Sequence, residues 1–448
     1  MALKFKVTNV FSLQVFQLLR FTVFLLISVF FVKSGLTNEE IGDFEQMLFI
    51  ASGISFFWIG GITQSLIPLY NNNNTFQTTQ RPGLVKSPEL FNAFLLLTFF
   101  SFLFSLLIIF SGSLGFSNKS IGKIPYHNIL ALYFFFNNPG ALIEYIYLLK
   151  NKAKHILVFG IVSFFVQLFL VCGPVLFGWG LLYGIWGLVI YTILRYSFVI
   201  YLLIRYAKFE FSWSFIKTHL NLGYPLIFSS LLSGSWQYID GIIALVTSNS
   251  ARFAIFRFGA KELPFVGQLA SGLANAMLTG FSSPESIADT LHTLKTKSLR
   301  LMHYLFPLTV FVMIFSKWIY ETFLFSPSFH RSVDVFLVYQ LMIISRLIFP
   351  QTILIGLKKT KVVLVASILE IVINVGATLL LMQRYGLVGI ALGSVSVHVL
   401  EKIYMVAYNY YKLGIKPTEY IPVRWFTFYS SMLILVFVLI DYRIIKVH

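Results

Sequence analysis

Apolar runs of about 20 residues recur from one end of this chain to the other, and they constrain its fold more than any other feature. A helix of that length crosses a hydrocarbon core of about 30 Å. Charged residues make up only 11% of the chain, against about 25% in soluble domains, and the mean hydropathy is +0.81. Because the runs are long and do not alternate, we predict an all-α polytopic membrane protein and not a β-barrel.

The runs predict about thirteen membrane spans, of which the last is short and follows a polar linker. Their approximate boundaries are 9–32, 46–70, 90–112, 126–149, 155–177, 180–205, 222–247, 252–281, 299–316, 332–356, 362–383, 386–411 and 423–440. A polar linker at 207–221 separates six runs from the next six, which favours an internal repeat. We therefore expect an N-terminal six-helix lobe at 1–210, a C-terminal six-helix lobe at 211–411, and a linker with one additional helix at 412–448.

The distribution of Lys and Arg predicts the orientation of these spans. With the N-terminus in the cytoplasm, the cytoplasmic loops carry more than twice as many of the 34 basic residues as the outer segments do. This bias is typical of membrane proteins. It also accounts for most of the net charge of +17, so we predict no nucleic-acid partner. The expected location is the cytoplasmic (inner) membrane.

The sequence contains no motif that indicates an enzyme. Walker, GxSxG, HExxH and CxxC patterns are absent, and no loop between spans is long enough for a catalytic domain. Cys172 is the single cysteine, which excludes an intrachain disulfide. The eight His lack the spacing of metal ligands. We expect a transporter with no catalytic residues, no bound metal and no cofactor, driven by its substrate gradient or by coupling to H⁺ or Na⁺.

The stretch at 236–264 places four ionisable groups inside the expected membrane region: Asp240, Arg257, Lys261 and Glu262. A charge at the bilayer centre costs about 2.5–3.5 kcal/mol, so such groups pair with one another or face a water-filled cavity. Counted from the outer ends of their runs, Asp240, Arg257 and Lys261 lie at a similar depth of about 8–13 Å. We expect Asp240 to pair with one of the two bases while the other faces a central cavity.

Other spans carry polar residues at helical spacing, which places them on one face of each helix. Examples are Glu370 and Asn374 in the run at 362–383, and Ser394 and His398 in the run at 386–411. Most Ser, Asn and Gln positions are interpreted as interhelical hydrogen bonds, while the charged positions favour a hydrated cavity. The candidate substrate-binding residues are Gln17, Arg20, Gln237, Asp240, Arg257, Lys261 and Arg346. The candidates for proton or cation coupling are Asp240, Glu370 and Glu401.

Four short motifs resemble the multidrug/oligosaccharidyl-lipid/polysaccharide (MOP) flippase superfamily, and within it the polysaccharide-transporter branch. They are Gly42-Asp43-Phe44, Tyr238-Ile239-Asp240, the FRFGAKELP segment at 256–264, and Phe349-Pro350-Gln351. The similarity covers roughly residues 9–411, and the thirteenth span departs from the superfamily's pattern.

The resemblance implies two six-helix lobes that work by alternating access. It implies a flippase that moves undecaprenyl-diphosphate-linked oligosaccharide to the outer leaflet for O-antigen, lipopolysaccharide or other surface polysaccharide synthesis, with polymerase or assembly proteins as partners. In such a flippase Arg20, Arg257 and Lys261 would compensate the diphosphate charge. The alternatives are a multidrug or cation antiporter, a peptidoglycan-precursor flippase of the same superfamily, and a membrane-embedded sugar polymerase or ligase.

Overall fold

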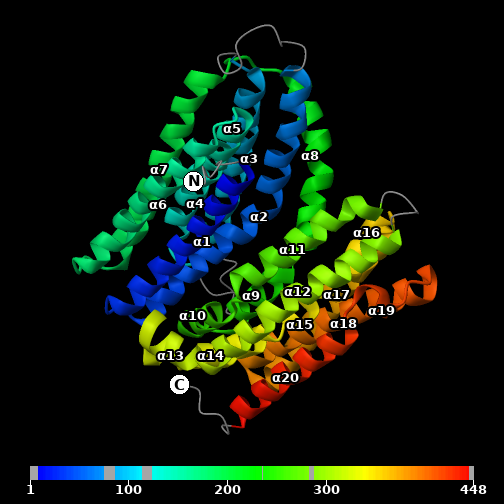
Figure 1. Cartoon of the computed structure of the whole chain (residues 1–448). Helices are drawn as coiled ribbons and strands as arrows, with labels where there is room; N and C mark the ends of the chain where they lie inside the picture. Colours follow the sequence, from blue (N-terminus) through cyan, green and yellow to red (C-terminus); the bar gives the residue numbers. More distant parts are fainter. Residues whose placement is uncertain (1–8, 75–85, 114–123, 235, 282–286, 443–448) are drawn as a thin grey trace, which may run out of the picture. The chain divides into compact units, whose positions relative to one another are not determined.

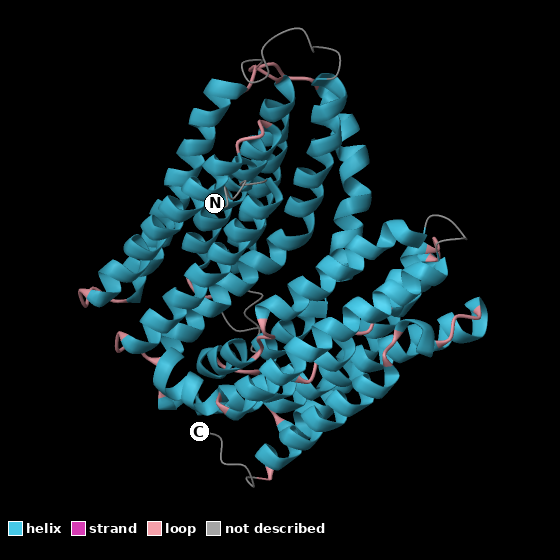
Figure 2. Ribbon diagram, viewed as in Figure 1, coloured by secondary structure: helices cyan, strands magenta, loops and turns pink. Residues whose placement is uncertain are grey.

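The chain is helical throughout the part described by the computed structural model, which covers residues 9–74, 86–113, 124–234, 236–281 and 287–442 (Figures 1 and 2). Within these ranges there is no strand, and the only β-type pairing is an isolated bridge between Ser87 and Ala207. The predicted all-α fold is confirmed.

The chain divides into two compact units. The first unit comprises Met1–Gly234 and Asn249–Ala251, and the second comprises Ser235–Ser248 and Arg252–His448. The helix at Trp213–Gly234, which the sequence analysis places in the second lobe, packs within the first unit. The six-plus-six repeat stays a prediction.

The first unit is a bundle of long helices. They are α1 (Asn9–Lys33), α2 (Asn38–Asn74), α3 (Pro88–Ser113), α4 (His127–Asn137), α5 (Leu142–Leu149), α6 (Ala153–Leu176), α7 (Leu181–Tyr206) and α8 (Trp213–Gly234), with a 3₁₀ turn η2 (Asn138–Ala141) between α4 and α5. The main packing pairs are α2 with α8, α1 with α6, α6 with α7, and α3 with α4. Trp58 of α2 is buried against Phe104 of α3 and Phe134 of α4.

The second unit contains more and shorter helices. They are α9 (Trp236–Thr247), α10 (Ser250–Gly259, which begins in the first unit), α11 (Pro264–Leu278), α12 (Ile287–Ile314), α13 (Ser316–Trp318), α14 (His330–Gln340), α15 (Ile343–Arg346), α16 (Pro350–Gly356), α17 (Thr360–Tyr385), α18 (Leu387–Leu413), α19 (Pro417–Tyr420) and α20 (Val423–Asp441), with the short turns η3 (Thr279–Phe281), η5 (Ile319–Leu324) and η6 (Pro327–Phe329). Helices α14, α17 and α9 all contact α18.

Helices α17 and α18 form the closest pair in the second unit. They are joined at Gly386, whose φ of 59° suits a residue without a side chain. Two glycines of α18, Gly389 and Gly393, lie directly against the backbone of α17. Small residues four apart allow two helices to approach closely in a membrane. This contact brings the polar faces of α17 and α18 together.

The number of spans differs from the expectation of about thirteen. Nine helices of the described chain are long and apolar enough to cross a membrane, or eleven if two bent pairs each count as one span. The expected run at 252–281 is not one helix, because it breaks at 260–263, just before Pro264, into α10 and α11. The expected run at 332–356 bends by 45° before Pro350. A proline lacks the amide donor that continues a helix, and each interruption falls directly before one.

Candidate functional site

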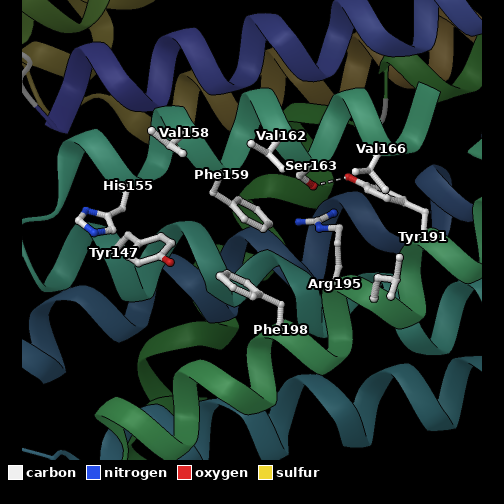
Figure 3. A pocket seen from close by; sticks show the side chains of 11 residues that line it. Tyr147, His155, Val158, Phe159, Val162, Ser163, Val166, Tyr191, Arg195 and Phe198 are labelled. Carbon is white, nitrogen blue, oxygen red and sulfur yellow. Dashed lines mark hydrogen bonds between the residues drawn. The ribbon is translucent and has the colours of Figure 1, made fainter. Parts of the chain in front are cut away.

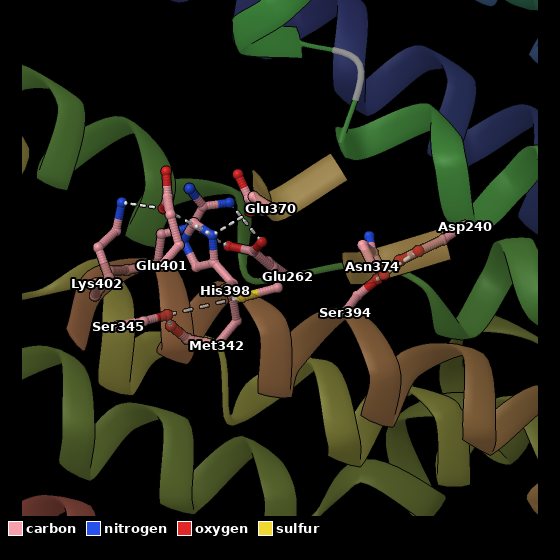
Figure 4. A network of polar contacts seen from close by, with 11 residues as sticks. Asp240, Glu262, Met342, Ser345, Glu370, Asn374, Ser394, His398, Glu401 and Lys402 are labelled. Atoms are coloured by element: carbon pink, nitrogen blue, oxygen red, sulfur yellow. Dashed lines mark hydrogen bonds and ion pairs between the residues drawn. The ribbon is translucent and has the colours of Figure 1, made fainter. Parts of the chain in front are cut away.

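A buried polar network connects α9, α17 and α18 of the second unit (Figure 4), and a side chain of α14 bonds to it as well. On α17, Glu370 and Asn374 are four residues apart, and on α18 Ser394 and His398 have the same spacing. Each pair therefore lies on one helix face. Because α17 and α18 pack along their length, the two faces meet. The sequence analysis identified both polar faces, and the structure shows that they meet each other.

Asp240 lies at one end of this network and is surrounded by oxygen atoms. Its carboxylate is buried and accepts hydrogen bonds from the hydroxyls of Tyr339 and Ser394. The Ser394 hydroxyl also lies 3.1 Å from Asn374 Oδ1, to which the Thr378 hydroxyl donates at 2.7 Å. Oxygen ligands of this kind suit a proton or a hard cation.

The contacts described for the Asp240 carboxylate are hydrogen bonds from two hydroxyl groups, and its expected ion pair with Arg257 or Lys261 stays a prediction. Both bases are half-buried. Arg257 lies in the last turn of α10, where its charge acts on Tyr339. Lys261 lies in the break after α10, with Nζ 5.3 Å from the centre of the Phe258 ring. The two bases and Asp240 therefore belong to one region of the second unit.

A second cluster lies further along the same two helices (Figure 4). His398 Nδ1 is 2.9 Å from Glu370 Oε1 and 3.7 Å from Glu401 Oε2. Lys402 Nζ is 2.9 Å from Glu401 Oε2, and all four residues are buried. The ligand atoms of Glu370, His398 and Glu401 lie within 4.8 Å of one another, close enough to hold a metal ion, although the sequence spacing predicted none. The Lys402 ammonium already pairs with the Glu401 carboxylate, and its positive charge would repel a metal cation at this position.

Arg346, which is expected to bind substrate, forms an ion pair with an acidic residue at the break between α10 and α11. Its guanidinium forms a two-point contact with Glu262, from Nε at 3.1 Å and from Nη2 at 2.8 Å. Gln340 Nε2 donates to the backbone oxygen of Lys261 at 3.1 Å. These contacts fix the non-helical segment 260–263, since a bidentate Arg–carboxylate pair specifies geometry as well as charge.

In the first unit, Gln17 and Arg20 are exposed on α1. A further base, Arg195 of α7, is largely buried, with Nη2 3.4 Å from Glu144 Oε1 and 3.1 Å from the Gly140 backbone oxygen. Arg195 and Glu144 lie 51 positions apart on different helices, so spacing within one helix could not predict this pair. The side chain of Gln237, another candidate, lies outside the described residues.

Comparison with known proteins gives the family. The family model described as polysaccharide biosynthesis protein matches residues 36–334. No curated protein matches this chain closely enough to count as a relative.

Solved structures give the fold. A lipid II flippase MurJ in an inward closed conformation matches with a TM-score of 0.62 and 17% identity, covering 96% of this chain and 92% of that one. An inward-facing multidrug resistance MATE family transporter of the MOP superfamily matches with a TM-score of 0.62 and 14% identity, covering 88% and 94%. A MOP superfamily transporter from Pyrococcus furiosus Vc1 matches with a TM-score of 0.56 and 15% identity, covering 91% and 95%. The MOP resemblance expected from the sequence is confirmed, and the chain is a multi-pass membrane protein with this fold.

Proposed function

The chain belongs to the polysaccharide biosynthesis protein family, and we propose that it is a flippase that carries an undecaprenyl-diphosphate-linked oligosaccharide from the cytoplasmic to the outer leaflet. In this proposal the N-terminus is cytoplasmic, the protein resides in the inner membrane, and the repeat unit serves O-antigen or related surface polysaccharide synthesis. Two lobes of six helices open a central cavity alternately to the two sides of the membrane. Polymerase and assembly proteins use the delivered product.

The broken helix at 260–263 is the observation that carries the proposal. Irregular backbone at membrane depth persists where it is enclosed by protein or lines a cavity. In transporters such breaks place the positive ends of half-helices near anionic groups of the substrate. Here α11 begins directly after the break, Lys261 lies within it, and Arg257 lies in the last turn of α10 just before it. These features together suit a diphosphate, whose charge must be compensated while it crosses a low-dielectric region.

The remaining candidates take distinct roles in this proposal. Arg20 and Gln17, exposed on α1, are available to the head group from the first unit. Gln237 is proposed as a hydrogen-bonding partner of the sugar. Arg346 pairs with Glu262 and so fixes the conformation of the segment 260–263, which makes it a positioning residue.

Asp240 is the residue that we propose for coupling to H⁺ or Na⁺. Its neighbours Tyr339, Ser394 and Asn374 all present oxygen atoms, and with Asp240 these residues come from four helices. Binding a cation at this point would favour one arrangement of those helices over another, which is how a coupling ion acts. Glu370 and Glu401 are weaker candidates, because Glu370 is hydrogen-bonded to His398 and Glu401 already pairs with Lys402.

Two other transport functions remain as alternatives, a multidrug or cation antiporter and a peptidoglycan-precursor flippase. The structural similarity does not choose between them, since the MurJ and MATE structures match with the same TM-score of 0.62. The family match favours a polysaccharide precursor.

The single substitutions Arg257→Ala and Lys261→Ala test the proposal. Both should abolish export of surface polysaccharide in cells, while the amount of protein in the membrane stays unchanged. Arg252→Ala is the matched control, because Arg252 lies on the same helix α10 but is exposed. Normal surface polysaccharide in both variants would refute the role of these bases in diphosphate binding.

A further inference from the structure

A groove on the first unit lies between α6 and α7, apart from the polar network of the second unit (Figure 3). Its volume is about 360 Å³. Tyr147 and His155 line one end, and Ser163, Tyr191 and Arg195 line the other. The function proposed above uses none of these residues.

The groove has the depth of a single membrane leaflet. Its lining on α6 extends from His155, near the start of the helix, to Val166. Eleven residues of helix rise about 16 Å. Half of a hydrocarbon core of about 30 Å is about 15 Å. A lipid chain anchored at the membrane surface next to His155 would therefore end where the groove ends.

The walls of the groove are apolar and open to the outside of the bundle. Val158 and Val162 of α6 are exposed, and the rings of Phe159 and Phe198 stack with their centres 5.2 Å apart. Both helices are membrane spans, so these side chains face hydrocarbon and not water. The occupant that suits such walls is a hydrocarbon chain.

The deep end of the groove is polar, but its charge is already compensated. Arg195 pairs with Glu144 and donates to the Gly140 backbone oxygen, and its guanidinium lies 5.9 Å from the centre of the Tyr191 ring. The Tyr191 and Ser163 hydroxyls are hydrogen-bonded at 2.9 Å. An acyl chain would therefore end at these polar groups, and the charge of Arg195 does not require an anionic head group at this end of the groove.

Basic side chains gather at the shallow end. Lys150, Lys152 and Arg205 all lie against the ring of Tyr206, at 5.7, 4.9 and 5.4 Å from its centre. Lys154, which precedes His155, is exposed. The Lys and Arg distribution predicts that this end is cytoplasmic, where membranes carry anionic lipids. The clustered positive charge complements a phosphate head group.

We propose that this groove binds one acyl chain of an anionic phospholipid whose phosphate lies at the basic cluster formed by Lys150, Lys152, Lys154 and Arg205. The undecaprenyl carrier is a poorer match, because its chain is much longer than one leaflet is deep and the polar end of the groove would stop it. A zwitterionic phospholipid fits the walls but gains less from the basic cluster.

Native mass spectrometry of the detergent-purified full-length chain tests this site. Phosphatidylglycerol and phosphatidylcholine with identical acyl chains compete for the protein, and undecaprenyl phosphate is added in a separate experiment.

Val162→Trp fills the groove, and Ile161→Trp is its matched control. The Val162 and Ile161 side chains are 57% and 58% exposed, but only Val162 lines the groove. The double variant Lys154→Gln/Arg205→Gln removes charge without changing the groove walls, and Lys412→Gln, an exposed lysine of the second unit, is its control.

We expect the unmodified chain to retain one phosphatidylglycerol in preference to phosphatidylcholine. Val162→Trp should lower that retention by about tenfold or more, since it displaces several methylene groups, while Ile161→Trp leaves it unchanged. The double charge variant should lose about tenfold of the preference for phosphatidylglycerol. Three results would each overturn the proposal. The first is equal retention of the two phospholipids, and the second is unchanged binding in both the Val162 and the charge variants. The third is displacement of phosphatidylglycerol by undecaprenyl phosphate. None of these results depends on whether the chain transports oligosaccharide.

Discussion

Replacing Gly393 with Ala should separate α17 from α18 and disturb the contacts of Asp240. A Cβ atom at position 393 would lie 2.5 Å from Thr378 Oγ1 and 2.8 Å from Thr378 Cα. Favourable contacts begin near 3.5 Å, so the helices must move apart by roughly 1 Å. Thr378 donates to Asn374, whose side chain lies beside Ser394 in the Asp240 cluster, so the displacement reaches that cluster.

The magnitude follows from a comparison with Gly376, which lies on the facing helix α17. A Cβ atom at Gly376 would meet nothing within 4 Å. Both substitutions gain the same helix propensity, about 0.5–1 kcal/mol. Only Gly393→Ala adds overpacking, which costs about 1–3 kcal/mol. The two variants should therefore differ by about 1–3 kcal/mol in the free energy of unfolding, with Gly393→Ala the less stable.

Unfolding by SDS in mixed micelles measures this difference on the purified chain. Transport by the same two variants, compared at equal protein levels, reports the effect on the Asp240 cluster. If Gly393→Ala is as stable as Gly376→Ala, the close contact of α17 and α18 does not exist as described, and the argument that assembles the Asp240 cluster from these helices fails.

Three further predictions concern the buried charges. Glu144→Ala leaves Arg195 buried without its acidic partner and should destabilise the first unit by about 3–5 kcal/mol, measured by SDS unfolding; the double variant with Arg195→Leu should recover most of that loss. Arg346→Lys keeps the charge but loses the two-point contact with Glu262, so its thermal midpoint should lie between those of the unmodified chain and Arg346→Ala; equal midpoints for Lys and Ala would contradict it. Asp240→Asn should remove the dependence of transport on an imposed H⁺ or Na⁺ gradient, and a variant that still responds to that gradient would exclude Asp240 as the coupling residue.

The all-helical fold was predictable because membrane spans need long apolar runs, and this requirement is local in sequence. The breaks were harder to predict. The segment at 252–281 is apolar enough to be taken as one span, yet it is interrupted at 260–263. Gly259 and Pro264 mark that interruption in the sequence, but a proline alone does not decide between a bend and a break, because α12 continues through Pro307.

The candidate residues were predictable as a set, whereas their partners were not. Helical spacing shows which side chains share a face, and it correctly grouped Glu370 with Asn374 and Ser394 with His398. It cannot show which faces meet. The partner of Arg346 lies 84 positions away, and Tyr339, which the sequence analysis did not select, lies 99 positions from Asp240. Tyrosine in an apolar run gives no signal that distinguishes a buried donor from a lipid-facing ring.

Reconstitution into liposomes measures directly what the chain moves. A fluorescent undecaprenyl-diphosphate disaccharide is placed in the liposomes, and a membrane-impermeant quencher reports how much of it reaches the outer leaflet. We expect rapid transfer with the unmodified chain and with Arg252→Ala, and transfer at the protein-free rate with Lys261→Ala. Transfer of a cationic drug without any transfer of the lipid-linked sugar would refute the proposed function.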